Sequence, residues 1–342
     1  MKYSGIGGQA VLEGVMMKNK EKYAVAVRKP DGEITVDTKE YYGLIKNKTL
    51  RNIPILRGVL SFVESLALGI STLTYSASFF EEDEEDTKAK KKELSKEAAA
   101  KKEKAEMGIT VAFSFVLAIG IFMILPYYLS LIFQKFITSH VALALIEGII
   151  RMMIFLAYIA SISLMKDIQR VFMYHGAEHK CINCIEHGME LNVENVRKSS
   201  RLHKRCGTSF LLFVMIISII FFIFIRVESP VARVVVRVLL VPVIAGVAYE
   251  FIRLTGRSNN IVMRILSLPG KGMQMLTTKE PDDDMIEVAI AAVEAVFDWR
   301  AFQGLKEEEP LEELEPDVPE LGSGQTDAPE LEELDEIKIE DL

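Results

Sequence analysis

The stretch ITVAFSFVLAIGIFMILPYYLSLIF, residues 109–133, decides the fold class of this chain. It carries no charged side chain over about 25 residues, which is long enough for a helix to cross the hydrocarbon core of a bilayer. Pro126 lies inside it and predicts a kink, because proline removes a backbone donor from a helix. The stretch is therefore predicted to be a kinked transmembrane helix.

Three further apolar runs, residues 141–165, 209–225 and 234–254, are predicted to span as well. Half of the 342 residues are hydrophobic and 26% are charged, yet the mean hydropathy is +0.22. These values coexist only where charge and apolar residues are segregated along the chain. The predicted fold class is therefore membrane α-helical, with about four transmembrane helices in a membrane domain over residues 109–254.

The connection over residues 166–208 is long and rich in lysine and arginine. Loops enriched in lysine and arginine close to the spans stay in the cytoplasm, so this loop is predicted to be cytoplasmic. With four spans, both termini share its side of the membrane. No apolar segment follows the N-terminal charge, so no cleaved targeting segment is expected.

The first 50 residues predict a small β-rich cytoplasmic unit, with strands at residues 23–28 and 33–37 around the turn Lys29-Pro30-Asp31-Gly32. Residues 53–80 form a long, mostly apolar helix that contains Arg57 and Glu64. Its length allows a span, while its internal charges favour an amphipathic or re-entrant helix. Both alternatives stay open.

Charge blocks flank the membrane domain. Residues 81–108 form a charged linker, and residues 255–300 are predicted to hold cytoplasmic amphipathic helices, one of them short, interfacial and closed by Pro269-Gly270. Residues 301–342 are an acidic tail of disordered composition. This tail carries most of the excess acid behind the net charge of −8. The remainder is roughly neutral to slightly basic, and nothing in it indicates a nucleic-acid partner.

The central loop contains the sequence His175-Gly176-Ala177-Glu178-His179. Residues four apart lie on one face of a helix, so the two imidazoles can bind one metal ion with Glu178 beside them. The same order of residues is found in inverted zinc hydrolases, where the glutamate activates water. The alternative is a juxtamembrane helix whose polar residues bond to the loop.

A second pattern competes for the same metal. Cys181 and Cys184 are followed after 18 residues by His203 and Cys206, which resembles a structural zinc site. On a continuous helix the two cysteines point away from the His175 face. Either the helix breaks after His179 and a Cys/His site forms, or it continues and His203 or Cys206 completes the histidine site. Cys181 and Cys184 are equally plausible as small buried residues.

Ionisable residues also lie inside the predicted spans. Glu147 and Arg151 are four apart and can neutralise each other in the bundle interior. Arg233 and Arg237 lie near the outer end of the fourth span and can snorkel to the membrane surface. Structural pairing is the expected role of all these ionisable residues. Glu250 is a possible further carboxylate for the loop site, and Glu13 in the glycine-rich N-terminal stretch is a weaker one.

Five sequence blocks resemble the signature blocks of the YqhQ-like family of bacterial membrane proteins of unknown function. They are Gly7-Gly8-Gln9-Ala10-Val11-Leu12-Glu13-Gly14-Val15-Met16-Met17, His175-Gly176-Ala177-Glu178-His179-Lys180, Val193-Glu194-Asn195-Val196, Arg201-Leu202-His203-Lys204-Arg205-Cys206-Gly207-Thr208-Ser209-Phe210 and Thr278-Lys279-Glu280-Pro281-Asp282-Asp283. Their order and number make the resemblance specific from residue 4 to about residue 297. The acidic tail lies outside it.

Members of that family are described as predicted metal-dependent enzymes. The resemblance therefore implies His175, His179, His203 and Cys206 as ligands of zinc or another divalent metal, with Glu178 as the catalytic residue. Cys181 and Cys184 depart from the family pattern, which favours a mixed His/Cys site. Lys204 stands where a proline is expected, away from any ligand position.

Two classes of function remain open. The chain is a candidate metal-dependent hydrolase of the bacterial cytoplasmic membrane, acting on a peptide or lipid-linked group at the membrane lipid surface. The alternative is a non-catalytic protein that binds or stabilises a membrane-protein complex of secretion or envelope synthesis, with the His/Cys cluster as a structural clasp.

Overall fold

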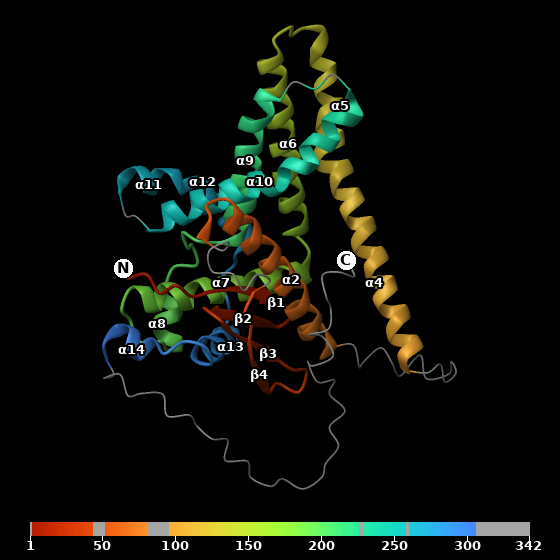
Figure 1. Ribbon diagram of the computed structural model, residues 1–342. Helices are drawn as coiled ribbons and strands as arrows, with labels where there is room; N and C mark the ends of the chain where they lie inside the picture. The colour runs from red at the N-terminus through yellow and green to blue at the C-terminus, as the bar shows by residue number, and fades with distance from the viewer. Residues whose placement is uncertain are drawn as a thin grey trace.

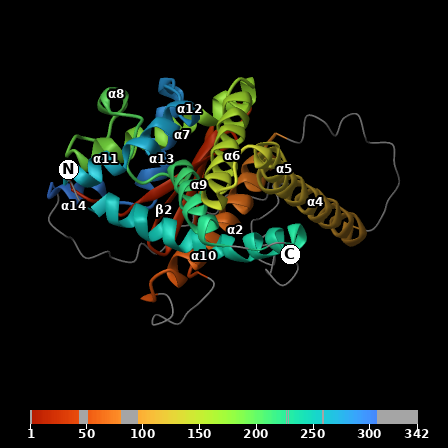
Figure 2. The ribbon, with the colours of Figure 1, turned by 90° about the horizontal axis from the view of Figure 1, so that it is seen from above.

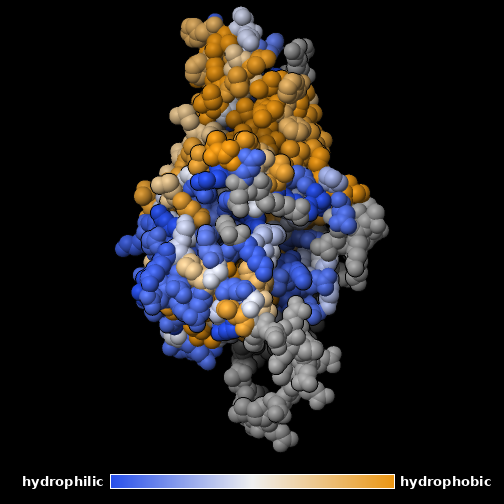
Figure 3. All heavy atoms as spheres, turned by 90° about the vertical axis from the view of Figure 1, so that its left-hand side faces the viewer, coloured by the Kyte–Doolittle hydropathy of each residue, from blue (hydrophilic) through white to orange (hydrophobic). Residues whose placement is uncertain are grey.

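The computed structural model describes residues 2–43, 52–80, 96–225, 227, 229–257 and 260–305. A helical stem stands on a globular head (Figure 1). The surface of the stem is hydrophobic and that of the head is largely hydrophilic (Figure 3). The acidic tail from residue 306 onward and the first part of the charged linker, residues 81–95, lie outside the described residues.

The stem is built from two helical hairpins that turn at the end far from the head (Figure 1). Its elements are α4 (Lys96–Ile119), η1 (Gly120–Ile124), α5 (Leu125–Leu131), η2 (Ile132–Lys135), α6 (His140–Ile162), α9 (Gly207–Phe224) and α10 (Pro230–Arg257). The expected irregularity at Pro126 is present as the π-helical turn η1 just before it. Because α4 begins at Lys96, the second part of the predicted linker is helical.

Among the described residues, five helices are long and apolar enough to cross a membrane. They are Leu56–Ser78, Gly108–Lys135, His140–Ile162, Gly207–Phe224 and Val231–Gly256. The last four agree with the four predicted spans. The multi-pass membrane class is therefore confirmed. The first helix, Leu56–Ser78, is the segment for which both a span and an amphipathic or re-entrant helix were predicted.

The head contains a four-stranded antiparallel sheet in the order β1-β2-β3-β4. Its strands are β1 (Gly7–Val11), β2 (Gly14–Asn19), β3 (Lys22–Arg28) and β4 (Ile34–Glu40). Successive side chains point to opposite faces of a strand. Val11 of β1 therefore belongs to the core under α2, whereas its neighbour Ala10 packs on the core of the other face. The predicted N-terminal β unit is confirmed.

Helix α2 (Leu56–Ser78) lies between stem and head. At its start, a Cβ on Gly58 would come within 2.8 Å of the Gly246 carbonyl oxygen of α10, so only glycine allows this approach. Farther along, Tyr75 is in the core beneath the sheet, and Ser76 Oγ accepts a hydrogen bond from the Leu12 amide at 3.0 Å. The second half of α2 therefore packs along the sheet. Whether this helix lies on, re-enters or spans the membrane stays a prediction, since it is also long and apolar enough to cross.

Two helices cover the other face of the sheet, and a third lies beside them at the edge of the head (Figures 1 and 2). The two covering helices are α7 (Lys166–Glu186) and α13 (Asp283–Glu294), and the third is α14 (Trp299–Gln303). Their apolar side chains join those of β2 and β3 in one buried core. Helix α13 was predicted from its apolar stripe, and Ile286, Ala289 and Val293 of that stripe are fully buried. Helix α7 is therefore enclosed by the sheet, by α13 and by residues 187–206, the loop that follows α7.

Two further helices lie where the stem meets the head. The predicted short helix is α11 (Ile261–Leu266), and it is followed by α12 (Leu268–Thr277). The prediction that Pro269-Gly270 closes a helix was wrong. Pro269 lies in the first turn of α12, where a proline costs no hydrogen bond.

A buried ion cluster joins three helices of the stem. Glu147 accepts hydrogen bonds from Arg151 at 2.7 Å and from Arg237, and Arg151 donates to Ser218 Oγ at 3.3 Å. The predicted Glu147–Arg151 pair is confirmed. The pairing expected for Arg237 is also present: the residue is 5% exposed, and its guanidinium binds the Glu147 carboxylate inside the bundle instead of snorkelling.

Candidate metal centre

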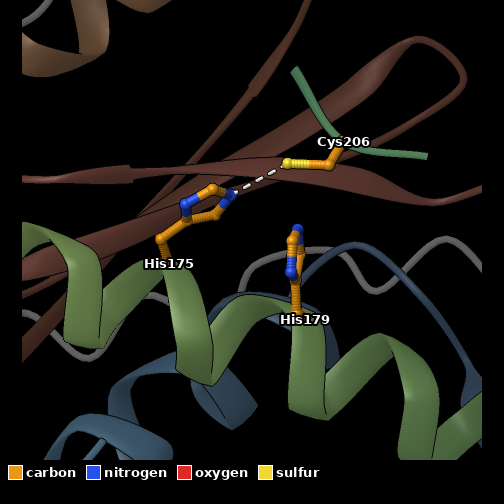
Figure 4. Close-up of side chains that lie close together, drawn as sticks. All are labelled: His175, His179 and Cys206. Carbon is orange, nitrogen blue, oxygen red and sulfur yellow. Dashed lines mark hydrogen bonds between the residues drawn. The ribbon is translucent and has the colours of Figure 1, made fainter. Parts of the chain in front are cut away.

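Helix α7 presents His175 and His179 on one face. The helix runs unbroken from Lys166 to Glu186, so of the two alternatives left open by the sequence it takes the continuous one. The ring centroids of the two imidazoles are 4.5 Å apart. Figure 4 shows both rings rising from α7 toward Cys206, with His175 Nε2 3.2 Å from Cys206 Sγ.

Backbone carbonyls fix the orientation of both imidazoles. Nδ1 of His175 donates to the Thr277 carbonyl oxygen at 2.8 Å, and Nδ1 of His179 donates to the Arg201 carbonyl oxygen at 2.6 Å. A carbonyl can only accept, so each Nδ1 carries the proton and each Nε2 faces the cluster. Metal-ligating histidines are held by the same kind of hydrogen bond from the far ring nitrogen.

Cys206 reaches the cluster from the start of the stem helix α9, where it is the N-cap residue. Gln274 of α12 holds the segment before it: its Oε1 accepts from the His203 amide at 2.8 Å, and its Nε2 donates to the His203 carbonyl oxygen at 2.7 Å. Thr208 Oγ1 lies 3.1 Å from Cys206 Sγ. The sulfur position is therefore set by hydrogen bonds from two helices.

The three side chains form a charge-coupled group. Burial alone raises the pKa of the Cys206 thiol, but the neighbouring His175 and His179 outweigh burial and hold this pKa well below its usual value. Burial lowers the pKa of His175, and the thiolate of Cys206 more than offsets this and raises it to about 9. The two imidazoles thus favour the thiolate, which is the metal-binding form of cysteine.

Glu178 lies beside this group on the next turn of α7. Its Oε2 is 3.9 Å from His175 Nε2, and the residue is 4% exposed. A Cβ on Gly8 of β1 would meet Glu178 Cγ at 3.1 Å, so the glycine makes room for the carboxylate. Gly176 has a similar role, since its Cβ would come within 2.0 Å of the Lys279 carbonyl oxygen, in the segment that supplies the Thr277 carbonyl.

The structure does not bring His203 into the three-residue group. Its Nε2 faces Glu186 Oε2 at 3.4 Å, and its ring centroid is 5.8 Å from that of His179. Glu186 also accepts from Arg205 at 2.5 Å and from the Ser4 amide at 3.0 Å. His203 therefore lies next to the cluster, in a separate network at the end of α7.

Cys181 and Cys184 point into the apolar core on the opposite side of α7. Burial raises the pKa of the Cys181 thiol well above its usual value and that of Cys184 to about 11. Both are protonated, buried residues. The alternative cysteine-rich zinc site is not formed, because a continuous helix separates these two residues from Cys206.

The other two carboxylates considered from the sequence have different partners. Glu250 forms a bidentate pair with Arg57 of α2. Glu13 has a positive φ of 49° in the turn between β1 and β2 and pairs with Arg170 of α7. Both join one element to another, outside the three-residue group.

His175, His179 and Cys206 together could hold a metal ion. Their ligand atoms all lie within 4.8 Å of one another. Two imidazoles and one thiolate are a donor set suited to zinc, and three protein ligands leave a fourth position for water or substrate. The two histidines also have the carbonyl partners that such ligands require. The residues therefore fit the ion.

The fold and this cluster define a class: a multi-pass membrane protein with a candidate metal centre between its head and its stem. Residues 53–299 match the family described as protein of unknown function (DUF1385), and the chain belongs to this family. The uncharacterized protein YqhQ of Bacillus subtilis (strain 168) is 35% identical over 285 residues, which cover 83% of this chain and 89% of the relative. No solved structure matches the chain.

Several residues of the site were not foreseen from the sequence. Thr277 and Gln274 come from about 100 and 70 positions away in the chain, and Asn183 Nδ2 holds the loop by donating to the Ser200 carbonyl oxygen at 2.6 Å. The only local signal for Asn183 was its position, four residues after His179, on the polar face of α7.

Proposed function

We propose that this protein is a zinc-dependent hydrolase whose centre lies at the cytoplasmic surface of the membrane. The single observation that carries the proposal is the pair of Nδ1 hydrogen bonds from His175 and His179 to backbone carbonyls, which aim both Nε2 atoms at the Cys206 thiolate. Side chains that served only to fill space would not need this orientation. His203 stays a predicted additional ligand.

In such a reaction the metal ligands and Glu178 would have different roles. A bound divalent ion would supply Lewis acidity toward water and toward the bond to be cleaved. Glu178, 3.9 Å from His175 Nε2, is placed to take a proton from a water molecule at the open side of the group. The burial of the carboxylate keeps bulk water away from this proton transfer.

The membrane placement of the proposal rests on charge. The basic residues of the loop over 166–208 favour the cytoplasmic side, and the head that contains this loop lies at one end of the stem. A group carried by a membrane lipid can reach a centre at this boundary without leaving the bilayer. The substrate is therefore proposed to be lipid-linked.

A second candidate function is a structural clasp. It is favoured by the burial of the ligands, since His179 is 1% and Cys206 7% exposed. A metal ion here would tie α7 of the head to α9 of the stem. The protein would then stabilise a membrane-protein complex instead of catalysing a reaction.

One pair of variants separates the two candidates. Wild-type protein and Glu178→Gln are purified in detergent, their zinc content is measured, and hydrolysis of a chromogenic phosphodiester is followed. The hydrolase predicts about one zinc in both and a rate about 100-fold lower in Glu178→Gln, the scale of general-base catalysis. Equal zinc and equal rates would overturn the catalytic role and favour the clasp. Folded wild type that takes up no zinc would overturn both.

A further inference from the structure

A polar cleft lies between β1 of the head and the ends of α2 and α10, apart from the metal ligands. One part has a volume of about 440 Å³ and is lined by Gly7, Gln9, Lys18, Lys20, Ser61 and Ser65, among others. A second part of about 370 Å³ is lined by Tyr3, Arg57, Glu64 and Arg253, among others. Ser61 and Tyr249 line both parts, so the two parts adjoin.

The cleft is located where the stem helix α10 and the start of α2 meet the head. Tyr249 and Arg253 belong to the last turns of the stem helix α10, whereas Arg57 and Ser61 belong to the first turns of α2. The other wall is the strand β1 of the head. A ligand in this cleft can therefore touch the head while its remainder lies along the stem.

The charge of the lining is positive. Lys18, Lys20, Arg57 and Arg253 line it, against the carboxylate of Glu64. Glu250 neutralises Arg57 with two hydrogen bonds and is 4.0 Å from Arg253, so two guanidinium groups share one carboxylate. Serine and tyrosine hydroxyls add neutral donors. This combination of cations and hydroxyl groups is suited to phosphate oxygens.

Glycine keeps the strand wall of the cleft open. Gln9 points to the α2 side of the sheet, where its amide donates to the Gly69 carbonyl oxygen at 3.1 Å. Gly7 is two residues earlier and faces the same side. A Cβ on Gly7 would meet no atom within 4 Å. A side chain here would enter the cleft, whereas the glycine lets a ligand approach the backbone.

We propose that this cleft binds the anionic phosphate headgroup of a membrane lipid. Four cationic side chains facing two carboxylates favour an anionic headgroup over a zwitterionic one, and the position at the end of the stem lets the acyl chains stay in the bilayer. A free phosphate offers the same oxygen atoms to the cleft, and binding measurements with inorganic phosphate distinguish it from a lipid headgroup. The binding of a lipid in this cleft does not depend on the proposed function. Only the further step, that the bound lipid is the substrate of the metal centre, rests on it.

Proximity supports a link between the two sites. Gly8 lines the cleft with its backbone, and its Cα hydrogen on the other side faces Glu178 Cγ, which a Cβ would meet at 3.1 Å. A single strand therefore separates the phosphate cleft from the carboxylate beside the metal ligands.

The test uses the full-length protein in phosphatidylcholine nanodiscs that contain a minor fraction of phosphatidic acid. Native mass spectrometry after release measures the lipids that stay bound. Wild type is expected to retain phosphatidic acid at least about tenfold over phosphatidylcholine. Arg253→Gln is expected to lower this preference about tenfold, the size of one charge-assisted hydrogen bond. Gly7→Leu is expected to abolish retention, because its side chain would enter the cleft. Lys271→Gln, a cation of α12 outside the cleft lining, is the matched control and should retain it.

The outcomes separate the sources of phosphate. If inorganic phosphate raises the unfolding temperature of wild type but not of Gly7→Leu, and no lipid is enriched, the ligand is a soluble phosphate and the lipid assignment is overturned. Equal retention of both lipids, or retention unchanged in folded Gly7→Leu, overturns the cleft as a phosphate site. Cys206→Ala should lose zinc and keep the lipid, and Gly7→Leu should lose the lipid and keep zinc, so the two proposals can fail separately.

Discussion

Cys206 and Cys184 are the same chemical group on opposite sides of one helix, and their surroundings give them opposite properties. Cys206 faces the polar side of α7, where two imidazoles keep it as a thiolate. Cys184 faces the apolar core, where burial raises its pKa to about 11. The difference teaches that position on a helix face, and not closeness in sequence, decides which cysteine can bind a metal.

Removal of Cys206 is expected to have the largest effect. Cys206→Ala should lower zinc affinity roughly 1000-fold, because loss of a direct ligand exceeds the 10–100-fold effect of outer partners. Competition with a chromogenic chelator measures this affinity. Cys184→Ala makes the same chemical change on the other face and should keep the affinity of wild type. Equal losses in the two variants would contradict the separation of the faces.

Glu186 closes the polar face of α7, and its replacement should have the next largest effect. Burial raises its pKa, but His203, Arg205 and the Ser4 amide together lower it to about 2. The carboxylate therefore stabilises the fold above its unfolded pKa, and this stabilisation is lost as the pH falls toward about 2. Glu186→Gln should lower the free energy of unfolding at pH 7 by about 3 kcal/mol.

Chemical unfolding in detergent at several pH values measures this contribution. The unfolding free energy of Glu186→Gln should change less than that of wild type between about pH 4.5 and pH 2. The exposed Glu194, paired with Lys198 on α8 (Val193–Lys198), is the matched control. A similar pH profile in wild type and Glu186→Gln would show that the buried network contributes no pH-dependent stability.

The proton shared between His175 and Cys206 gives a smaller, pH-dependent effect. Because the pKa of His175 is raised to about 9, its imidazole holds a proton below that pH, and an ion must displace it. Zinc affinity should therefore rise about tenfold per pH unit up to about pH 9. Calorimetry in buffers of different ionisation enthalpy counts the protons released. The pKa of His179 is raised as well, so one or two released protons per ion fit this charge distribution, whereas no released proton would contradict it.

Cys181→Ala is expected to have the smallest effect. The side chain is fully buried in the apolar core, so its truncation should cost about 1 kcal/mol of stability, as a typical core change does. Zinc content should not change. A variant that folds as well as wild type but loses zinc would place Cys181 in the metal site, against its position in the structure.

The four stem helices could be predicted from the sequence because an uncharged apolar run is a local signal that only a few folds satisfy. The same holds for the face shared by His175 and His179, which follows from helical spacing. Arg237 was different, since its place near the end of a span allows snorkelling as well as pairing, and its partner Glu147 lies 90 positions away in the chain. Contacts between distant segments have no local periodicity.

The sequence likewise could not predict which residue of the loop completes the metal site. Cys206 and His203 are three positions apart, and whether one, the other or both face His175 depends on how Gln274 holds the loop. The docking of α2 on the sheet could not be predicted for the same reason, because it depends on contacts between distant segments. Its apolar composition fits a bilayer and a sheet equally well, and the hydrogen bond from the Leu12 amide to Ser76 joins segments 64 positions apart, which no local pattern predicts.

The contact between His175 and Cys206 has a consequence for the unfolded chain. The two residues are 31 positions apart. His175 lies in α7, which follows the stem helix α6, and Cys206 immediately precedes the stem helix α9. An ion that both residues bind would close a loop of that length and remove conformational entropy from the unfolded state. For a covalent cross-link of this span the gain is about 4 kcal/mol. Stripping the ion should thus let α6 and α9 separate more readily, well away from the atoms that bind it.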